Sequence, residues 1–553
     1  MGEPTLAQSL GWPPIARGES TLICAPTGSG KTLAAFLWAL DRLAFGRAPK
    51  KTKAESVRVL YVSPLKALAV DVERNLRAPL MGILEHARAR GETAKEISVA
   101  VRTGDATATE RARMRRHPPD VLITTPESLY LMLTSQAAET LRGVETVIVD
   151  EIHQLVANKR GAHLFVSLER LEAIRHGGRL QRIGLSATQK PLEEVARVLG
   201  GYDDDGPRPV TIVDAGARRD LVLSVSTPDV DMARLGDRDS GPGSGDGEID
   251  PSEPHEPRSI WPHLHRRIVA DIEAHRSTMV FVNSRRLAER LATALNDAAG
   301  KELALAHHGS VAREKRAVIE DKLKRGELPA IVATSSLELG IDMGAVDLVI
   351  QVEAPPSIAS GLQRVGRASH QVGGVPKGIL LPKHRADLLA CAAAAAGMRA
   401  SDVEETRALE NPLDVLAQQI VAICAASDEP TDVEELHALI RRATPFRTLP
   451  RGAFEEVLDM LTGRYPSDDF AELRPRLHWD RVRGRLHARP GTKQLAITSG
   501  GTIPDRGLYG VFLATGSETT RPKRVGELDE EMVFESRVGE VFLNDGHDVF
   551  ALH

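Results

Sequence analysis

The stretch TLICAPTGSGKT, residues 21–32, joins a short apolar run to a glycine-rich turn, and LAAFLWALDRL follows it directly. The apolar run predicts a buried strand, and the segment after the turn predicts a helix. A glycine-rich turn between a strand and a helix is typical of a phosphate-binding loop, because its backbone amides can face a polyphosphate at the helix N-terminus. We expect Lys31 to neutralise the β and γ phosphates and Thr32 to hold Mg²⁺. The nucleotide-binding residues of this loop would be Thr27, Gly28, Ser29, Gly30, Lys31 and Thr32.

A second strand candidate, VETVIVD, ends at Asp150 and is followed by Glu151. A carboxylate at the carboxyl end of a parallel strand faces the same crevice as the phosphate loop. Asp150 would hold Mg²⁺, and Glu151 would orient or deprotonate an attacking water. An Asp-Glu pair alone is typical of a solvated strand end. Together with Lys31 and Thr32, it predicts a nucleotide hydrolase.

Short Val/Ile/Leu-rich runs alternate with amphipathic stretches through residues 20–225 and again through residues 259–398. Such alternation predicts buried parallel strands with helical crossovers, so we expect an α/β fold with two parallel-sheet domains, residues 1–225 and 259–398. Between them, residues 226–258 are rich in Gly, Pro, Ser and acidic residues, which predicts a flexible acidic linker. The clearest strand candidates are Thr21–Cys24, Arg58–Val62, Asp120–Thr124, Thr146–Val149, Ser277–Ser284 and Pro329–Ser336.

The pattern changes after residue 398. Asn411–Ala426 and Gly452–Leu461 have apolar residues at helical spacing, and a capping box of Thr431 and Glu434 would open a helix between them. Three helices followed by a strand or wing at Leu486–Thr498 favour a winged-helix module at residues 399–484, although a plain helical connector fits the same pattern. Gly/Asp turns beyond Gly500 predict β hairpins.

The second α/β domain contains Gln363-Arg364-Val365-Gly366-Arg367. Two guanidinium groups at this spacing could reach a γ phosphate across an interdomain cleft, as arginine fingers do. Standing alone, Gln363, Arg364 and Arg367 would be a surface basic cluster. With the phosphate loop in the same chain, they predict an ATP-driven motor.

The composition is that of a globular protein, with 42% hydrophobic and 27% charged residues. No apolar run reaches the ~18 residues that a membrane span requires, so we expect no membrane partner. Three cysteines cannot form a disulfide framework, which favours the reducing cytoplasm. The net charge is −5, but residues 229–256 carry −7 of it, which leaves +2 for the rest. Nucleic acid is therefore not excluded as a partner.

These motifs resemble those of superfamily 2 helicases and occur in the same order. Gln8 resembles the adenine-reading glutamine, APTGSGKT motif I, and DEIH, which contains His153, motif II. The remaining resemblances are SPLKALAVD (63–71) to motif Ia, RTGD (102–105) and TTPES (124–128) to motif Ib and its neighbours, SAT (186–188) to motif III, VFVNSR (280–285) to motif IV, ATSSLELGID (333–342) to motif V and QRVGR to motif VI.

Within that superfamily, the chain is similar to the large helicase-related (Lhr) family. The marks are GWPPI after the glutamine, KRGAHL after DEIH, RSIWPH, HHGS and NPLDVLAQQIV. GTIPDRGLYGVFL and RVGELDEEMVFESRVG resemble the β-barrel segment of that family, so residues 485–553 would be a partial β-barrel-like region. Compared with the family, the chain looks short at its C-terminus.

The resemblance implies two RecA-like domains in tandem that close on ATP and Mg²⁺, followed by the winged helix and the start of the barrel. Gly340 and Asp342 of motif V would also contribute to nucleotide binding. Ser186, Thr188 and His153 would couple closure to the grip on nucleic acid. The nucleic-acid contacts would be Lys66, Arg102, Thr125, Ser284 and Thr334, which could hold phosphates and sugars without reading sequence.

The implied activity is ATP-dependent translocation from 3′ to 5′ on single-stranded DNA, with unwinding of duplex DNA or DNA–RNA hybrids, in DNA repair. The protein would be cytoplasmic and associated with the nucleoid when bound to DNA. Two alternatives stay open: an ATP-driven remodelling protein that does not separate strands, and an inactive truncated helicase.

Overall fold

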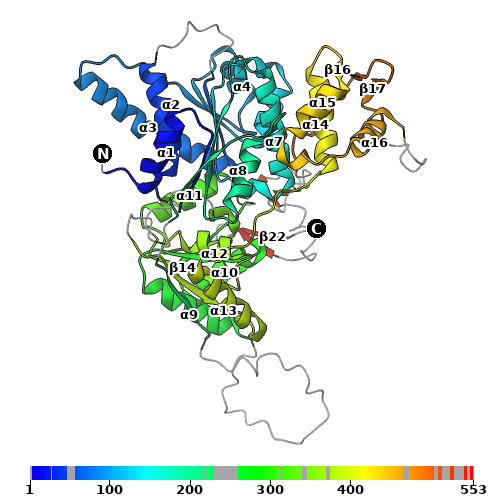
Figure 1. The fold of residues 1–553 in the computed structure, drawn as a ribbon. Helices are drawn as coiled ribbons and strands as arrows, with labels where there is room; N and C mark the ends of the chain where they lie inside the picture. Colours follow the sequence, from blue (N-terminus) through cyan, green and yellow to red (C-terminus); the bar gives the residue numbers. More distant parts are fainter. Residues whose placement is uncertain are drawn as a thin grey trace, which may run out of the picture. The chain divides into compact units, whose positions relative to one another are not determined.

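The computed structural model describes residues 3–26, 28–46, 57–216, 220–228, 259–309, 311, 313–338, 346–368, 374–464 and 474–502, together with strands at 509–512, 524–528, 541–544 and 548–551. The chain divides into two compact units (Figure 1). The first contains Met1–Ala217 and Glu405–Pro504, and the second contains Arg218–Glu404 and Asp505–His553. Most of the predicted linker, from residue 229 to residue 258, lies outside the described residues.

The first unit is built on a sheet of seven parallel strands in the order β3-β4-β2-β5-β6-β1-β9. The predicted strands at residues 21–24, 58–62, 120–124 and 146–149 are confirmed as β1, β2, β4 and β5. The strand bounds are β1 Thr21–Cys24, β2 Val59–Val62, β3 Val99–Arg102, β4 Val121–Thr124, β5 Thr146–Val149, β6 Gln181–Ser186 and β9 Thr211–Asp214.

Helices cover both faces of this sheet because successive strand residues point to opposite sides. Ile23 and Ile148 face the core formed with α1, α2 and α3, whereas Leu22 and Val147 face the core formed with α5, α7 and α8. Burial on both faces explains why the strands are continuously apolar. The helix bounds are α1 Leu6–Ala16, α2 Lys31–Phe45, α3 Lys66–Ala89, α4 Ala108–Arg116, α5 Pro126–Leu133, α6 His153–Val156, α7 Lys159–Ile174 and α8 Leu192–Gly200.

The second unit contains a sheet of six parallel strands in the order β10-β15-β14-β11-β13-β12. The strands are β10 Val222–Val225, β11 Thr278–Phe281, β12 Ala304–His307, β13 Ala330–Ala333, β14 Leu348–Val352 and β15 Lys377–Leu381. The helices are α9 Trp261–Glu273, α10 Arg285–Ala299, α11 Arg313–Lys324, α12 Ile358–Val365 and α13 Arg385–Ala400.

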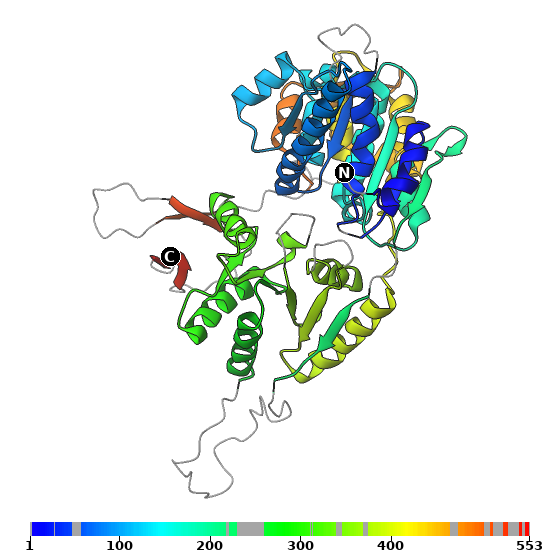
Figure 2. The ribbon, with the colours of Figure 1, turned by 90° about the vertical axis from the view of Figure 1, so that its left-hand side faces the viewer.

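One predicted domain boundary is wrong. Residues up to 225 were expected in the first domain, but β10 pairs in parallel with β15 of the second sheet and lies beside α13 (Figure 2). The physical reason is that Leu223 is buried in the core of the second sheet. The chain therefore passes from the first unit to the second before residue 222.

The predicted winged helix is confirmed, with helices α14 Leu413–Ala426, α15 Val433–Arg441 and α16 Arg451–Thr462. Its sheet has the order β16-β18-β17, from Thr431–Asp432, Arg485–Ala488 and Leu477–Asp480. The helix α15 begins one residue later than expected, because Asp432 and not Thr431 accepts the capping bonds from the amides of Glu434 and Glu435.

The boundary expected after residue 484 also requires correction. It falls between β17 and β18, which are the two strands of one antiparallel hairpin. The stretch expected to form a strand or wing, Leu486–Thr498, contains most of β18 and then the helix α17 Thr492–Thr498, which packs against α14. Residues 485–498 therefore belong with the winged helix and not with a barrel.

The winged helix and the first sheet share one hydrophobic core, and α14 and α15 lie beside α7 (Figure 1). At their seam, the buried guanidinium of Arg170 donates to Oε1 of Gln419 at 2.9 Å and to the hydroxyl of Thr134 at 3.2 Å. Burial lowers the pKa of Arg170 to about 10. The amide of Gln419 donates in turn to the carbonyl oxygen of His163 on α7 at 3.0 Å.

Beyond residue 502, the described residues form two hairpins, β19 Tyr509–Phe512 with β20 Arg524–Leu528 and β21 Val541–Asn544 with β22 Asp548–Ala551. These hairpins do not confirm the expected β-barrel. Among the described residues, we find no helix with both the length and the apolar character needed to cross a membrane.

We predict that Gln419→Leu destabilises the first unit. The change removes one of two acceptors from a buried guanidinium, and leaving a buried charged donor without its acceptor costs about 3 kcal/mol. The thermal unfolding midpoint should fall by roughly 6 °C. The exposed Gln494→Leu makes the same chemical change on α17 and should leave the midpoint unchanged. Equal midpoints for the two variants would show that the Arg170–Gln419 pair does not stabilise the seam.

Candidate nucleotide site

Three adjacent strands of the first sheet bring the predicted motifs to one edge. β5, β6 and β1 are neighbours and run parallel, so their carboxyl ends meet. The phosphate loop follows β1, Ser186 ends β6, and Asp150 directly follows β5. The backbone amide of Ala25 donates to the carbonyl oxygen of Ser186 at 3.1 Å, which ties the start of the loop to the end of β6.

The loop has the backbone conformation that its glycines allow. Gly28 and Gly30 have φ angles of +78° and +80°, a left-handed region that glycine adopts without strain. The ammonium group of Lys31 donates to the carbonyl oxygens of Ala25 and Pro26, at 3.0 Å from the latter. Lys31 and Thr32, both half-buried, form the first turn of α2, and Ser29 donates to Pro26 at 2.6 Å. Thr27 lies outside the described residues.

Gln8 contacts this loop from α1. Its amide Nε2 donates to the carbonyl oxygen of Gly30 at 3.4 Å, and its Oε1 accepts from the amide of Thr5 at 3.1 Å. Thr5 caps α1 and also donates to the carbonyl oxygen of Ser29 at 2.7 Å. The predicted adenine-reading residue therefore lies against the glycine-rich turn, and the capping Thr5 is a contact that sequence reasoning missed.

The two carboxylates of the DEIH motif are buried at the end of β5. Asp150 accepts a hydrogen bond from the hydroxyl of Tyr61 and, at 2.9 Å, from the amide of Glu151. Burial, and then the charge of Glu151, raise the pKa of Asp150 to about 7. Burial and Asp150 also raise the pKa of Tyr61 well above its usual value. Glu151 has a φ of +44°, a strained conformation for a residue other than glycine.

The residues fit the expected Mg²⁺ ion by their chemistry. Asp150 and Thr32 supply the carboxylate and hydroxyl oxygens that this hard cation prefers. Two carboxylates held together in a buried place raise the pKa of Asp150, and a cation would relieve that repulsion. Tyr61 was not predicted, although a buried tyrosine in an apolar strand requires a partner for its hydroxyl, and that requirement could have drawn attention to it.

Motif III lies against motif II. The hydroxyl of Ser186 is fully buried, 3.4 Å from Nδ1 of His153, and donates to the carbonyl oxygen of Ala187 at 2.9 Å. The amide of Ala187 donates to the same Nδ1 at 3.3 Å. Oε2 of Glu151 lies 3.5 Å from Nδ1 of His153. The structure thus brings Ser186, His153 and Glu151 together, with Thr188 half-buried two residues further along.

In the second unit, the predicted arginines are buried. Arg364 donates to Oε2 of Glu338 at 3.2 Å and to Oε1 of Gln351 at 2.9 Å, and its guanidinium lies over the ring of Phe281. Arg367 donates to the carbonyl oxygen of Glu338 at 3.1 Å. Gln363 is half-buried on α12. Glu338 is a partner that the sequence did not reveal, and Gly340 and Asp342 lie outside the described residues.

The expected nucleic-acid contacts differ in accessibility. Exposed Lys66 pairs with Asp105 at 2.7 Å, and exposed Ser284 caps α10. Arg102 is half-buried, and burial lowers its pKa to about 10. The other two are buried: Thr125 donates to Ser128 at 3.1 Å, and Thr334 directly follows β13. Their role in binding nucleic acid stays a prediction.

Three family models match the chain. A DEAD/DEAH box helicase domain matches residues 5–197, and a helicase conserved C-terminal domain matches residues 262–371. The winged helix domain of large helicase-related proteins matches residues 396–549. The matched segments contain six of the seven strands of the first sheet, four of the six strands of the second sheet, and the winged helix.

Known proteins show the same resemblance. An Lhr helicase/probable uracil glycosylase from Mycolicibacterium smegmatis is 54% identical, over 97% of this chain and 36% of the relative. The ATP-dependent helicase Lhr-Core protein 2 of Thermococcus barophilus is 39% identical, over 96% of this chain and 59% of the relative. A solved structure of Mycobacterium smegmatis helicase Lhr bound to ssDNA and AMP-PNP has a TM-score of 0.80 and 54% identity, covering 97% of this chain and 65% of that chain. This chain thus spans about a third of the length of the mycobacterial relative.

We predict that Gly30→Ala impairs nucleotide binding at the loop. A Cβ atom at Gly30 would lie 2.5 Å from Nε2 of Gln8, and the φ of +80° disfavours any side chain. The affinity for a fluorescent ATP analogue, measured by titration, should fall at least tenfold. Gly18→Ala is the matched control, because Gly18 has the same φ of +80° and nothing within 4 Å of its Cβ position. A similar loss in both variants would assign the effect to backbone strain alone.

Proposed function

The chain belongs to the large helicase-related family of superfamily 2 helicases, and from this premise we propose that it is an ATP-dependent helicase that moves along single-stranded DNA and separates duplexes. The observation that carries the proposal is the meeting of Lys31, Asp150, Glu151 and Ser186 at one edge of the first sheet. The family models and relatives described above support it.

For hydrolysis, we assign the roles by chemistry. Lys31 neutralises the β and γ phosphates, the loop amides from Gly28 onward face them, and Gln8 lies beside the loop to contact the adenine. Glu151 orients or deprotonates the attacking water. Thr32 and Asp150 would hold Mg²⁺, which would supply positive charge to offset the negative charge of the polyphosphate during hydrolysis.

The second unit would complete the site. We assign Arg364 and Arg367 to the γ phosphate as arginine fingers, with Gln363 beside them. Arg364 is bonded to Glu338, so this role requires it to exchange that carboxylate for phosphate oxygens when nucleotide binds. Gly340 and Asp342 of motif V are proposed as further nucleotide contacts.

Coupling between hydrolysis and grip is assigned to motif III. Ser186 and His153 connect the end of β6 to the residues after β5, so a shift of Glu151 on hydrolysis is transmitted to Ser186 and Thr188. The nucleic-acid strand would contact Lys66, Arg102, Thr125, Ser284 and Thr334. Movement from 3′ to 5′, DNA–RNA hybrids among the substrates and a role in DNA repair belong to this proposal. So does association with the nucleoid.

The first prediction is that single-stranded DNA stimulates steady-state ATP hydrolysis and that raised salt weakens the stimulation, because the strand is held through phosphates. Glu151→Gln removes the general base and should lower the turnover rate by roughly 10²-fold or more. Glu193→Gln, an exposed carboxylate of α8, is the control and should hydrolyse ATP normally. A folded sample whose rate of ATP hydrolysis is the same with and without single-stranded DNA would contradict the proposal.

The second prediction separates a helicase from a remodelling protein. The double variant Ser186→Ala, Thr188→Ala should retain DNA-stimulated ATP hydrolysis but lose strand displacement, because the coupling hydroxyls are gone. The control is Ser427→Ala, Thr293→Ala, which removes two hydroxyls outside the site. Normal unwinding by the motif III variant would show that the hydroxyls of Ser186 and Thr188 do not couple hydrolysis to unwinding. Absence of unwinding by the unchanged chain would favour remodelling without strand separation.

A further inference from the structure

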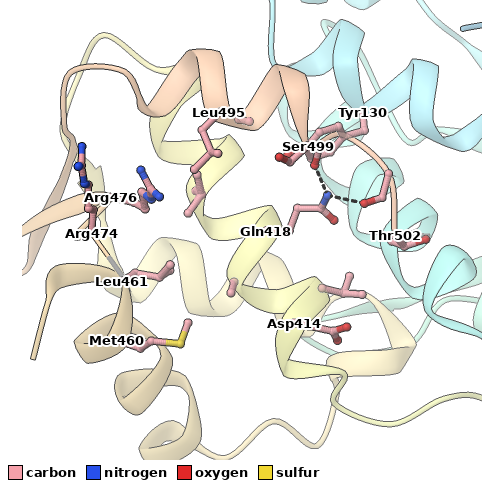
Figure 3. Close-up of a pocket in the computed structure, with 15 residues that line it drawn as sticks. Tyr130, Asp414, Gln418, Met460, Leu461, Arg474, Arg476, Leu495, Ser499 and Thr502 are labelled. Carbon is pink, nitrogen blue, oxygen red and sulfur yellow. Dashed lines mark hydrogen bonds between the residues drawn. The ribbon is translucent and has the colours of Figure 1, made fainter. Parts of the chain in front are cut away.

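A cavity of 470 Å³ lies between Tyr130 of α5 and the winged helix (Figure 3). All of its lining residues belong to the first unit. Its walls are largely apolar, with Val415 and Val421 from α14, Met460 and Leu461 from α16, and Leu495 from α17. This volume is within the range of small-molecule sites, and apolar walls with a few placed polar groups are typical of such sites.

The two ends of the cavity carry different polar groups. Arg474 and Arg476 lie together at one end, and Tyr130 lies with Ser499 toward the other (Figure 3). Within the described part of the chain, we find no carboxylate paired with either arginine. The hydroxyl of Tyr130 is buried and has no hydrogen-bond partner among the described residues, which is costly unless a ligand supplies one.

Two other polar residues of the wall, Gln418 and Asp414, already have partners. The amide of Gln418 donates to the carbonyl oxygens of Ser499 at 2.6 Å and Gly501 at 2.9 Å. Asp414 pairs with Lys159 at 2.6 Å. The cavity therefore offers three kinds of contact. The two arginines at one end suit an anion, the aliphatic walls suit a flat or apolar body, and the Tyr130 hydroxyl suits one further polar atom of a ligand.

We propose that this cavity binds a nucleotide, with the base between the aliphatic side chains of α14, α16 and α17 and the phosphate at Arg474 and Arg476. An apolar, planar body with an anionic group at one end is the chemistry that the wall matches, and a base edge can supply the partner that the Tyr130 hydroxyl requires. The nucleotide is either one unit of the translocated strand or a free mononucleotide. The first of these rests on the proposed function.

The consequence for translocation follows from the shared core. The winged helix and the sheet that carries the phosphate loop share one hydrophobic core, so a nucleotide in this cavity is held by the same unit as the ATP loop. Because the cavity holds the base without a set of hydrogen bonds matched to one base, the site would tolerate any sequence.

The first experiment measures the affinity of the full chain for fluorescent oligothymidylate at several salt concentrations. For Arg474→Gln, Arg476→Gln, we expect about tenfold weaker binding and a slope of log affinity against log salt that is smaller by about 0.7, since both arginines hold one phosphate and each phosphate contact on a single strand contributes roughly 0.7. The control, Arg407→Gln, Arg483→Gln, removes two exposed arginines of the same unit and should bind with the slope of the unchanged chain.

The second experiment tests the cavity itself. Tyr130→Phe removes a hydroxyl that has no partner, so its unfolding midpoint should not fall, yet we expect a three- to tenfold loss of affinity with an unchanged salt slope. Ala417→Leu fills the space beside α14 and should weaken binding in the same way. Photo-crosslinking of an oligonucleotide that contains 4-thiothymidine should label peptides with Met460 or Leu495.

Titration with thymidine monophosphate distinguishes the two sources. Loss of its binding in the cavity variants, with oligothymidylate binding unaffected, assigns the cavity to free nucleotides. The proposal is overturned if neither probe depends on Arg474, Arg476 or Tyr130, or if crosslinks map only outside the cavity, the result expected when the occupant is an acidic peptide. The two proposals can fail separately. If single-stranded DNA does not stimulate ATP hydrolysis but the cavity binds thymidine monophosphate, only the proposed function is contradicted.

Discussion

The parallel adjacency of β5, β6 and β1 is the constraint on which the site depends. Because these strands share a direction, the groups that follow them meet at one edge without any long connecting loop. The same adjacency forces two carboxylates into a buried position, where Asp150 has a raised pKa and accepts the Tyr61 hydroxyl. That arrangement is unfavourable for an isolated protein and suited to a cation and a polyphosphate.

Much of this could be predicted from the sequence, because the relevant signals are local. Continuous apolar runs such as Thr146–Val149 predicted strands buried on both faces, and the glycines before Lys31 predicted the loop. Partners supplied by distant residues could not be predicted. Tyr61 reaches Asp150 only because β2 pairs with β5, and Glu338 reaches Arg364 only through the packing of the second unit.

The missed boundaries have a similar cause. Val222–Val225 is a short strand, and its sequence does not indicate which sheet it joins. Its place in the second sheet is set by pairing with β15, which lies about 150 residues further along the chain. Arg485–Ala488 is likewise defined by its antiparallel partner β17. Helix α14 was predicted well, yet nothing in its pattern indicates that Gln419 would satisfy a buried arginine of α7. Pairing and burial between distant segments are properties of the whole fold.

The discontinuous first unit affects how the protein is made. The segment from Arg218 to Glu404 is inserted between the first sheet and the winged helix, so about 190 residues separate the two halves of one core. At a synthesis rate of about 5–20 residues per second, roughly 12–50 s pass between the synthesis of Phe165 and that of its core partner Val415. Throughout that interval, the nascent chain exposes an apolar surface that favours aggregation, and chaperones that bind such surfaces would protect it.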